Sequence, residues 1–254
     1  MKCIIVRRRF LSLLVCAALA ASMIVVINHP VFVGASATTR QLPIYCVQKD
    51  YKVCALSFDA AWGNEDTQQL IDILGKYNVK ATFFVVGDWV DRYPDSVKAL
   101  SSAGHEIMNH SNNHAHFNSL ISSQIMEDIN TCNQKIEAIT GVHPTLFRPP
   151  YGEYNDLVVS TVRSMGMEPI QWDVDSLDWK NLTASEISKR VTSRVQPGSI
   201  VLFHNAAKNT PEALPSVLET LLQDGYTFVP ISELVLSGSY VMDHSGKQCP
   251  VTAP

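Results

Sequence analysis

Apolar residues alternate along residues 51–236 between short continuous runs and longer segments with helical spacing. The continuous runs predict buried strands, and apolar residues three or four positions apart predict helices. The predicted strands cover residues 53–58, 81–86, 106–109, 146–147, 167–174, 199–203 and 226–229. The predicted helices cover residues 66–77, 96–102, 122–140, 155–165, 185–195 and 211–223.

Strands that alternate with helices are typical of a parallel sheet with helical crossovers. Seven such units in one domain favour an α/β fold, an irregular (β/α) barrel of about seven strands, over an open sheet. Thr183 and Glu186 form a capping-box pattern before one predicted helix. We therefore expect one catalytic domain at residues 51–236, a polar linker at 38–50 and a C-terminal tail at 237–254.

The first 37 residues have the pattern of a targeting segment. Arg7, Arg8 and Arg9 precede an apolar run at residues 10–27, and a small-residue cleavage site is present at residues 35–37. A positive segment before such a run stays in the cytoplasm and directs the rest of the chain across the membrane. Residues 1–37 are thus a signal peptide or a membrane anchor, with a twin-arginine export signal as a further alternative. Either way, we expect the domain to be extracytoplasmic.

Composition narrows the choice of partners. Hydrophobic residues make up 46% of the chain and charged residues 17%, which is typical of a folded globular protein. The net charge of -4 gives no basic face for nucleic acid.

Cysteine spacing argues against a cysteine metal site, because the chain has no C-x-x-C pair. Cys54 and Cys132 fall in predicted core positions and are expected to be buried thiols. A bridge between Cys46 and Cys249 is conceivable.

Polar residues follow the predicted strands at the points where chemistry gathers in β/α folds. Asp59 comes directly after the first strand, as a site residue or as a cap for the next helix. His110 and His114 follow the third strand, and a helical turn would place both imidazoles on one face. Such a pair suits a zinc-like ion, whereas the alternative is a solvated histidine-rich loop.

Later strands end in similar positions. Arg148 precedes two prolines, whose rigid backbone can aim its guanidinium. Asp175 and Trp179 lie after the next strand, in a surface loop or in the wall of a sugar site. His204 follows the sixth strand and, taken alone, would be interpreted as a core histidine. Together these residues predict a single catalytic site at the strand ends.

The same segments resemble the five motifs of the NodB-like polysaccharide deacetylases, carbohydrate esterase family 4, over about residues 50–235. The motifs are Ser57-Phe58-Asp59, His110-Ser111-x-x-His114, Arg148-Pro149-Pro150-Tyr151-Gly152, Asp175-x-x-Asp178-Trp179 and Leu202-Phe203-His204. Within that family the chain looks most like the PdaB-type sporulation deacetylases, which carry one N-terminal membrane segment. The resemblance implies a NodB homology domain that removes N-acetyl groups from a sugar with the help of a metal ion.

The resemblance also implies roles on the metal side. His110 and His114 would hold a divalent ion, either zinc or, as alternatives, cobalt or manganese. Asp59 would be the general base, and Arg148 would orient it and keep it ionised.

Further roles concern the leaving group and the substrate. His204 would be the general acid, with Asp175 setting its charge and orientation. The backbone N–H of Tyr151 would stabilise the oxyanion, and Trp179 and Leu202 would complete the substrate-binding wall.

One position departs from the family pattern. Where the family has a second aspartate as third metal ligand, this chain has Ala60. Glu65 or Asp66 could replace it, two histidines with waters could suffice, or the metal site is lost.

Three functions therefore remain open. The first is deacetylation of an N-acetylated glycan outside the membrane, such as peptidoglycan in the cell wall or spore cortex. The second is a catalytically silent glycan-binding or sporulation-scaffold domain. The third is a different hydrolase on the same fold.

Overall fold

The computed structural model describes residues 40–251. The predicted signal peptide or membrane anchor lies outside the described residues. Within residues 40–251, no helix combines the length and the apolar character needed to cross a membrane.

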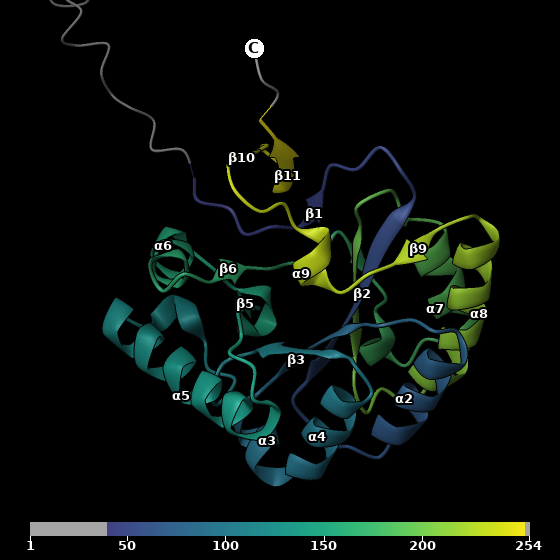
Figure 1. Ribbon diagram of the computed structural model, residues 1–254, viewed down its shortest axis with the longest axis horizontal. Helices are drawn as coiled ribbons and strands as arrows, with labels where there is room; N and C mark the ends of the chain where they lie inside the picture. The colour runs from purple at the N-terminus through teal and green to yellow at the C-terminus, as the bar shows by residue number, and fades with distance from the viewer. Residues whose placement is uncertain (1–39, 252–254) are drawn as a thin grey trace, which may run out of the picture. The chain divides into compact units, whose positions relative to one another are not determined.

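The central sheet is parallel and its strands follow the order β6-β5-β4-β3-β2-β8-β7. It curls into a half-barrel with helices around it (Figure 1), which confirms the predicted barrel. Short β9 pairs with the start of β2. The strands are β2 (Val53–Ala60), β3 (Thr82–Val85), β4 (Glu106–Asn109), β5 (Leu146–Phe147), β6 (Glu168–Pro169), β7 (Val174–Asp175), β8 (Ile200–His204) and β9 (Thr227–Phe228).

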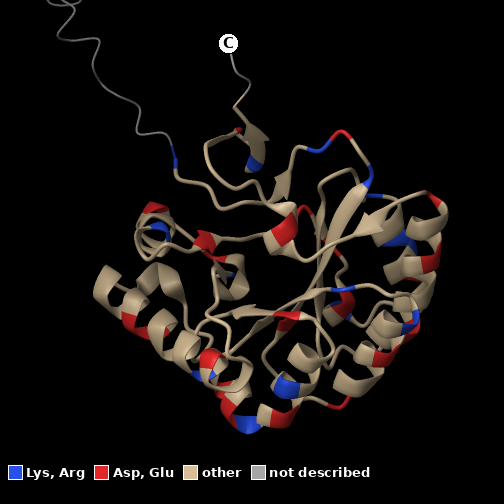
Figure 2. Cartoon of the chain, in the orientation of Figure 1, with Lys and Arg blue, Asp and Glu red and all other residues tan. Residues whose placement is uncertain are grey.

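The crossover helices lie close to their predicted positions. They are α2 (Thr67–Lys76), α4 (Pro94–Ser102), α5 (Ser122–Thr140), α6 (Asp156–Ser164), α7 (Ala184–Thr192) and α8 (Thr210–Gln223). The described chain also contains α3 (Gly87–Arg92) and α9 (Ile231–Leu234). The Thr183–Glu186 capping box begins α7 as predicted. Figure 2 shows that Lys and Arg positions alternate with Asp and Glu positions along the surrounding helices. Two short helices, α3 and α9, were not expected, because one or two turns carry too few residues to show a period.

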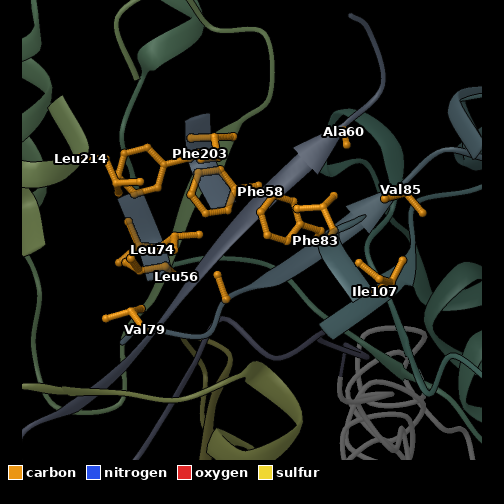
Figure 3. Close-up of a cluster of buried hydrophobic side chains, with 14 of the residues drawn as sticks. Leu56, Phe58, Ala60, Leu74, Val79, Phe83, Val85, Ile107, Phe203 and Leu214 are labelled. Atoms are coloured by element: carbon orange, nitrogen blue, oxygen red, sulfur yellow. The ribbon is translucent and has the colours of Figure 1, made fainter. Parts of the chain in front are cut away.

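Alternation along β2 separates the helix-facing core from the site. Phe58 and Ala60 belong to the large hydrophobic cluster between the sheet and the helices, whereas Asp59 between them does not. Figure 3 shows Phe58 between Phe83 and Phe203, with ring centroids 4.8 and 5.5 Å away. The odd-even pattern of one strand therefore directs the aspartate to the inner face of the barrel.

The expected linker and tail both contain strands. β1 (Cys46–Val47) pairs in parallel with β11 (Lys247–Pro250), which pairs with β10 (Tyr240–Met242). Ile44 and Val47 are completely buried in a second hydrophobic cluster, so this segment is part of the fold. The Cys46 and Cys249 thiols are both free in this arrangement.

The predicted strand at 167–174 is interrupted between β6 and β7. Ile44 bridges to Ile170, and the Gln171 N–H donates to the Ile44 carbonyl (2.7 Å). Asp173 accepts hydrogen bonds from Ser199 and Ile200 and so ties this segment to the start of β8. The N-terminal segment thus closes the gap that the broken strand leaves in the barrel.

Candidate active site

A cavity of about 650 Å³, hereafter the main cavity, lies at the carboxyl ends of the strands. Its volume falls in the range of roughly 300–1,000 Å³ usual for ligand sites. All the predicted site residues except Arg148 line it, namely Asp59, His110, His114, Tyr151, Asp175, Trp179, Leu202 and His204. The strand-end positions therefore do converge on one site.

Arg148 lies beneath the main cavity and holds Asp59. Its side chain is fully buried, and its Nη1 donates to Asp59 Oδ1 at 2.7 Å. Nη2 donates to the Gln171 carbonyl (3.1 Å), and the guanidinium lies over the Phe84 ring (4.2 Å to the centroid). Burial alone would raise the pKa of Asp59, but the positive charge of Arg148 outweighs it and lowers that pKa. Asp59 is therefore ionised, with Oδ2 free of the arginine.

The two metal-ligand candidates come together through a loop. Residues 110–115 form no helix, and Ser111 and His114 have φ of 72° and 56°. The His110 and His114 rings meet edge to face with centroids 5.0 Å apart. The expected helical turn is thus wrong, because two left-handed residues turn the chain instead.

Both imidazoles are neutral near pH 7. Burial lowers the pKa of His110, and burial together with neighbouring His110 lowers the pKa of His114 to about 4. His110 Nδ1 lies 2.7 Å from the Arg148 carbonyl, so this nitrogen carries the proton. The unprotonated Nε2 then faces Asp59 Oδ2 at 3.5 Å. Two acceptors in this position favour a cation between them.

The described residues supply an incomplete set of ligands. His110 and His114 fit a zinc-like ion, which accepts neutral imidazole nitrogen. The Ala60 methyl packs in the hydrophobic cluster, and no group of three His, Cys, Asp or Glu side chains within residues 40–251 is arranged to hold a metal. The residues present thus fit an ion held by two nitrogens, with its other positions left to water and substrate.

Glu65 and Asp66 do not take the place of the missing aspartate. Both line a second cavity, whose wall contains neither His110 nor His114. Asp66 Oδ2 instead accepts a hydrogen bond from the Ala206 N–H at 2.9 Å.

His204 is held by Asp178, whereas Asp175 was the expected partner. His204 Nδ1 lies 2.8 Å from Asp178 Oδ1, and the His204 backbone N–H donates to Oδ2 at 2.8 Å. Thr210 Oγ1 also donates to Asp178 Oδ2 at 2.7 Å. Asp175 lines the cavity and accepts from the Leu177 N–H. Leu177 has φ of 55°, and this left-handed turn carries the chain on to Asp178 beneath His204.

The environment keeps His204 protonated above its ordinary pKa. Burial by itself would lower the pKa, but the hydrogen bond and negative charge of Asp178 outweigh it and raise the pKa above 6.5. Asp59 and His204 are register partners on neighbouring parallel strands β2 and β8. A carboxylate that accepts protons and an imidazolium that donates them therefore stand side by side at one strand end.

Tyr151 lies over the imidazoles. Its backbone is left-handed (φ 59°), and its ring contacts His114 edge to face (4.4 Å) and stacks on His116 (4.3 Å). Within residues 40–251 no acceptor receives the Tyr151 N–H, which is therefore available to a ligand. The Gly152 that follows has φ of 67°, and a Cβ there would lie 2.9 Å from Trp172.

Sequence reasoning did not assign Trp62 to the site. Its indole is 58% exposed, lines the main cavity and contacts His114 edge to face at 5.5 Å. A tryptophan three residues after Asp59, in the loop that follows the first predicted strand, was the sequence signal that could have found it. Trp179 is similarly exposed on the same cavity, whereas Leu202 is buried in its wall.

The loops around the main cavity carry most of the backbone strain. Seven non-glycine residues within residues 40–251 have positive φ, and all but Asn78 lie in these loops. The six are Ser111, His114, Tyr151, Leu177, Asn181 and Ala206. Each such conformation costs about 1–3 kcal/mol and persists only where its surroundings fix it. The loops are therefore held in defined shapes.

Comparison with known proteins now decides the family. The polysaccharide deacetylase family profile matches residues 47–170. A peptidoglycan-N-acetylglucosamine deacetylase of Bacillus cereus is 35% identical over 194 residues, which are 74% of this chain and 91% of that protein. The chain belongs to the polysaccharide deacetylase family.

Other family members are longer or differ in activity. The chain spans 60% of YlxY and 40% of the peptidoglycan-N-acetylmuramic acid deacetylase PdaC, both of Bacillus subtilis, at 34% and 36% identity over 76% and 74% of this chain. A solved CE4-family pseudoenzyme from Bacillus anthracis has a TM-score of 0.74 and 36% identity, covering 76% of this chain and 69% of that chain. A mutant of that pseudoenzyme with restored enzymatic activity has been solved as well (TM-score 0.74, 37% identity, covering 76% and 71%).

Proposed function

We propose that this protein hydrolyses N-acetyl groups on an extracytoplasmic glycan, with peptidoglycan as the substrate class. The observation that carries the proposal is the facing pair of Asp59 held by Arg148 and His204 held by Asp178. General acid–base catalysis needs these two protonation states within reach of one substrate. Relatives named as peptidoglycan deacetylases support the choice of glycan.

Asp59 Oδ2 accepts the proton of the attacking water, whose oxygen adds to the acetamide carbonyl carbon. His204 donates its Nε2 proton to the sugar nitrogen as the C–N bond breaks, giving acetate and a free amine. His204 Nδ1 keeps its proton and donates it in a hydrogen bond to Asp178 Oδ1, which orients the ring. Asp175 lies near enough for its charge to help raise the pKa of His204. The Tyr151 N–H stabilises the developing oxyanion.

A divalent ion bound by His110 and His114 would supply Lewis-acid polarisation of the acetyl carbonyl. Zinc is the first choice, because both ligands are neutral imidazoles, with cobalt or manganese as alternatives. Trp62, Trp179 and Leu202 form the walls that receive the sugar and its acetyl group.

The place of action follows from the N-terminal pattern of arginines and apolar residues, which directs the domain out of the cytoplasm as a secreted or anchored protein. The assignment to PdaB-type sporulation deacetylases rests on the motif resemblance and on that single apolar segment.

A second candidate is a silent glycan-binding or scaffold domain. It is favoured by Ala60 at the third ligand position and by the similarity to a pseudoenzyme. The two candidates differ in metal content and turnover.

The test follows acetate release from N-acetylated peptidoglycan by the purified, metal-stripped protein, with and without added zinc. We expect zinc-dependent release that His204→Ala abolishes, while His143→Ala leaves it intact because His143 pairs with Glu137 on the surface. Absence of acetate, together with absence of bound metal, would overturn the deacetylase and leave the binding domain.

A further inference from the structure

Gln171 lies in the interruption between β6 and β7 and is bonded to three separate parts of the chain. Its backbone N–H donates to the Ile44 carbonyl at 2.7 Å, and its own carbonyl accepts from Arg148 Nη2 at 3.1 Å. Its side-chain Nε2 donates to the Gly152 carbonyl at 2.9 Å. The residue is only 2% exposed. A buried residue whose polar groups are bonded in this way is held in one defined arrangement.

The Gly152 carbonyl belongs to a turn that needs support from outside. Tyr151 and Gly152 both have left-handed backbones, with φ of 59° and 67°. For a residue with a side chain, such as Tyr151, this conformation persists only where its surroundings fix it. Two backbone hydrogen bonds close the turn from within. Among the described residues, the Gln171 amide makes the one hydrogen bond that joins residues 150–152 to another part of the chain.

Packing fixes the same turn against the segment that contains Gln171. A Cβ at Gly152 would lie 2.9 Å from Trp172 Cη2 and 3.3 Å from Gln171 Oε1. Trp172 lines the main cavity, and the Arg148 guanidinium lies 5.6 Å from the centroid of its ring. Residues 171 and 172 therefore contact both the turn and the buried arginine.

The two partners of Gln171 hold different parts of the site. Arg148 holds Asp59, the proposed base, whereas the turn carries the Tyr151 N–H, which no acceptor within residues 40–251 receives. The attack of water and the growth of charge on the carbonyl oxygen belong to one step, so the base and the N–H have to fit one substrate. A misplacement of about 1 Å can cost about 100-fold in rate. Gln171 is bonded to both sides and can set their spacing.

We propose that Gln171 is a positioning residue, which holds the Tyr151 N–H in a fixed place relative to the Arg148–Asp59 pair. Gln171 is not part of the wall of the main cavity, so it acts through these groups rather than on the substrate. The inference rests on the proposed deacetylase function for the role of the Tyr151 N–H as a donor to the oxyanion. The alternative is a glutamine that only stabilises the fold.

Gln171→Met removes the Nε2 donor but keeps the volume and the backbone contacts of the residue. Acetate release from soluble N-acetylated peptidoglycan fragments is followed on the full chain with added zinc. We expect kcat to fall at least about tenfold, because a misplaced donor stabilises the oxyanion less. KM should change less than about twofold, since the oxyanion exists only in the transition state.

Gln248→Met is the matched control. Gln248 is fully buried, and its Nε2 donates to the Leu236 carbonyl at 3.1 Å, away from the main cavity. The substitution therefore removes the same kind of hydrogen bond from the same kind of environment. It should lower the thermal midpoint as Gln171→Met does but leave kcat unchanged.

Gln171→Glu is the conservative variant. Its carboxyl group can donate to the Gly152 carbonyl only while it is protonated, whereas the carboxylate repels that oxygen. Its rate relative to the parent should therefore rise as pH falls, while the relative rate of Gln171→Met stays constant. A glutamine that only stabilised the fold would give no such recovery in variants that the thermal midpoint shows to be folded at each pH.

Backbone NMR provides a measurement without turnover. In Gln171→Met, the amide signals of Tyr151 and Gly152 should shift and exchange with solvent faster, because the turn has lost its external support. In Gln248→Met, both signals should stay as in the parent.

The outcomes separate this inference from the proposed function. Release at the parent rate by Gln171→Met, or an equal loss in Gln248→Met, overturns the positioning role and leaves the deacetylase. A deficit of Gln171→Glu that equals that of Gln171→Met at every pH also overturns it. If the parent releases no acetate, the deacetylase fails and the amide signals decide. Signals that move in Gln171→Met alone then support the positioning role, and unchanged signals overturn it.

Discussion

The two sides of the main cavity differ in how their charged groups are held. On the proton-transfer side, Asp59, Arg148, Asp178 and His204 are all paired, and all but His204 are buried. On the proposed ion-binding side, His110 and His114 meet without a third protein ligand, and Ala60 lies in the hydrophobic cluster.

This difference shows which parts of the site the fold itself requires. Removing one member of a buried ion pair leaves an uncompensated charge, so the pairs of the proton-transfer side maintain one another. By the family resemblance an aspartate at position 60 would be a third ligand, but it would also add a buried charge to the hydrophobic cluster in which Ala60 lies. The stability of the fold therefore depends on the paired charges of the proton-transfer side, and it does not depend on a carboxylate at position 60.

The largest expected effect comes from breaking the buried pair. Arg148→Met should lower the free energy of unfolding by about 3–5 kcal/mol, because Asp59 would remain buried and charged without its partner. Denaturant titration measures the change. Asp59→Leu combined with Arg148→Met should recover part of the loss. A double variant as unstable as the sum of the two single variants would show that the pair does not couple.

Restoring the third ligand tests the other side. Ala60→Asp should tighten zinc binding by at least about tenfold. Loss of a group that only orients a metal ligand already lowers metal affinity about 10- to 100-fold, and a carboxylate that binds the ion directly should contribute no less. In a chelator the same variant should unfold at lower temperature, because the added carboxylate is buried without a partner. Zinc titration and thermal unfolding measure both effects.

Ala61→Asp is the control, because position 61 lies beyond the end of β2 in the half-buried loop. Unchanged zinc affinity in Ala60→Asp would show that position 60 faces only the hydrophobic cluster.

The pH dependence separates Asp178 from Asp175. The pKa of His204 is raised above 6.5, so its acid form persists above that pH and is lost as pH rises through the folded value. Asp178→Asn removes the charged partner and should move the alkaline limb of kcat/KM to lower pH. Asp175→Asn should move it less, since Asp175 acts by charge alone.

Titration of the His204 ring by NMR gives the same comparison without turnover. The idea fails if Asp175→Asn causes the larger shift. The stability that the His204–Asp178 pair contributes is fully present below pH 6.5 and declines as pH rises through the folded pKa.

The smallest expected effect concerns Tyr151. Glu153→Gln weakens the exposed contact to His116, whose ring stacks on Tyr151. Exposed ion pairs contribute about 0–1 kcal/mol, so kcat/KM should fall by less than about fivefold. Glu137→Gln breaks the comparable His143 pair away from the cavity and is the control. A much larger loss for Glu153→Gln would give His116 a direct part in catalysis.

The barrel was predictable because its strands are buried on both faces and appear as continuous apolar runs. The pairing of β1 with β11 was not, since strands of two and four residues carry no period and their partners come from opposite ends of the described chain. The broken strand at 167–174 was missed for a related reason. Its interruption depends on Ile44, far away in sequence.

The site shows the same division. The convergence of Asp59 and His204 was predictable, because carboxyl ends of parallel strands meet at one edge. The choice between Asp175 and Asp178 depends on the left-handed backbone of Leu177, a residue type that does not signal such a turn. The contact between His110 and His114 likewise arises from left-handed Ser111 and His114 rather than from helical spacing.

The parallel pairing of β1 with β11 has a mechanical consequence. Tyr45 N–H donates to the Gly246 carbonyl and Gln48 N–H to the Gln248 carbonyl, at 2.9 and 2.8 Å. Tension applied before β1 and after β11 pulls two parallel strands from opposite ends. These hydrogen bonds then bear the load together in shear instead of opening one after another. The β1–β11 pair would therefore carry this tension, and the barrel, which lies between the two strands in the sequence, would not be loaded.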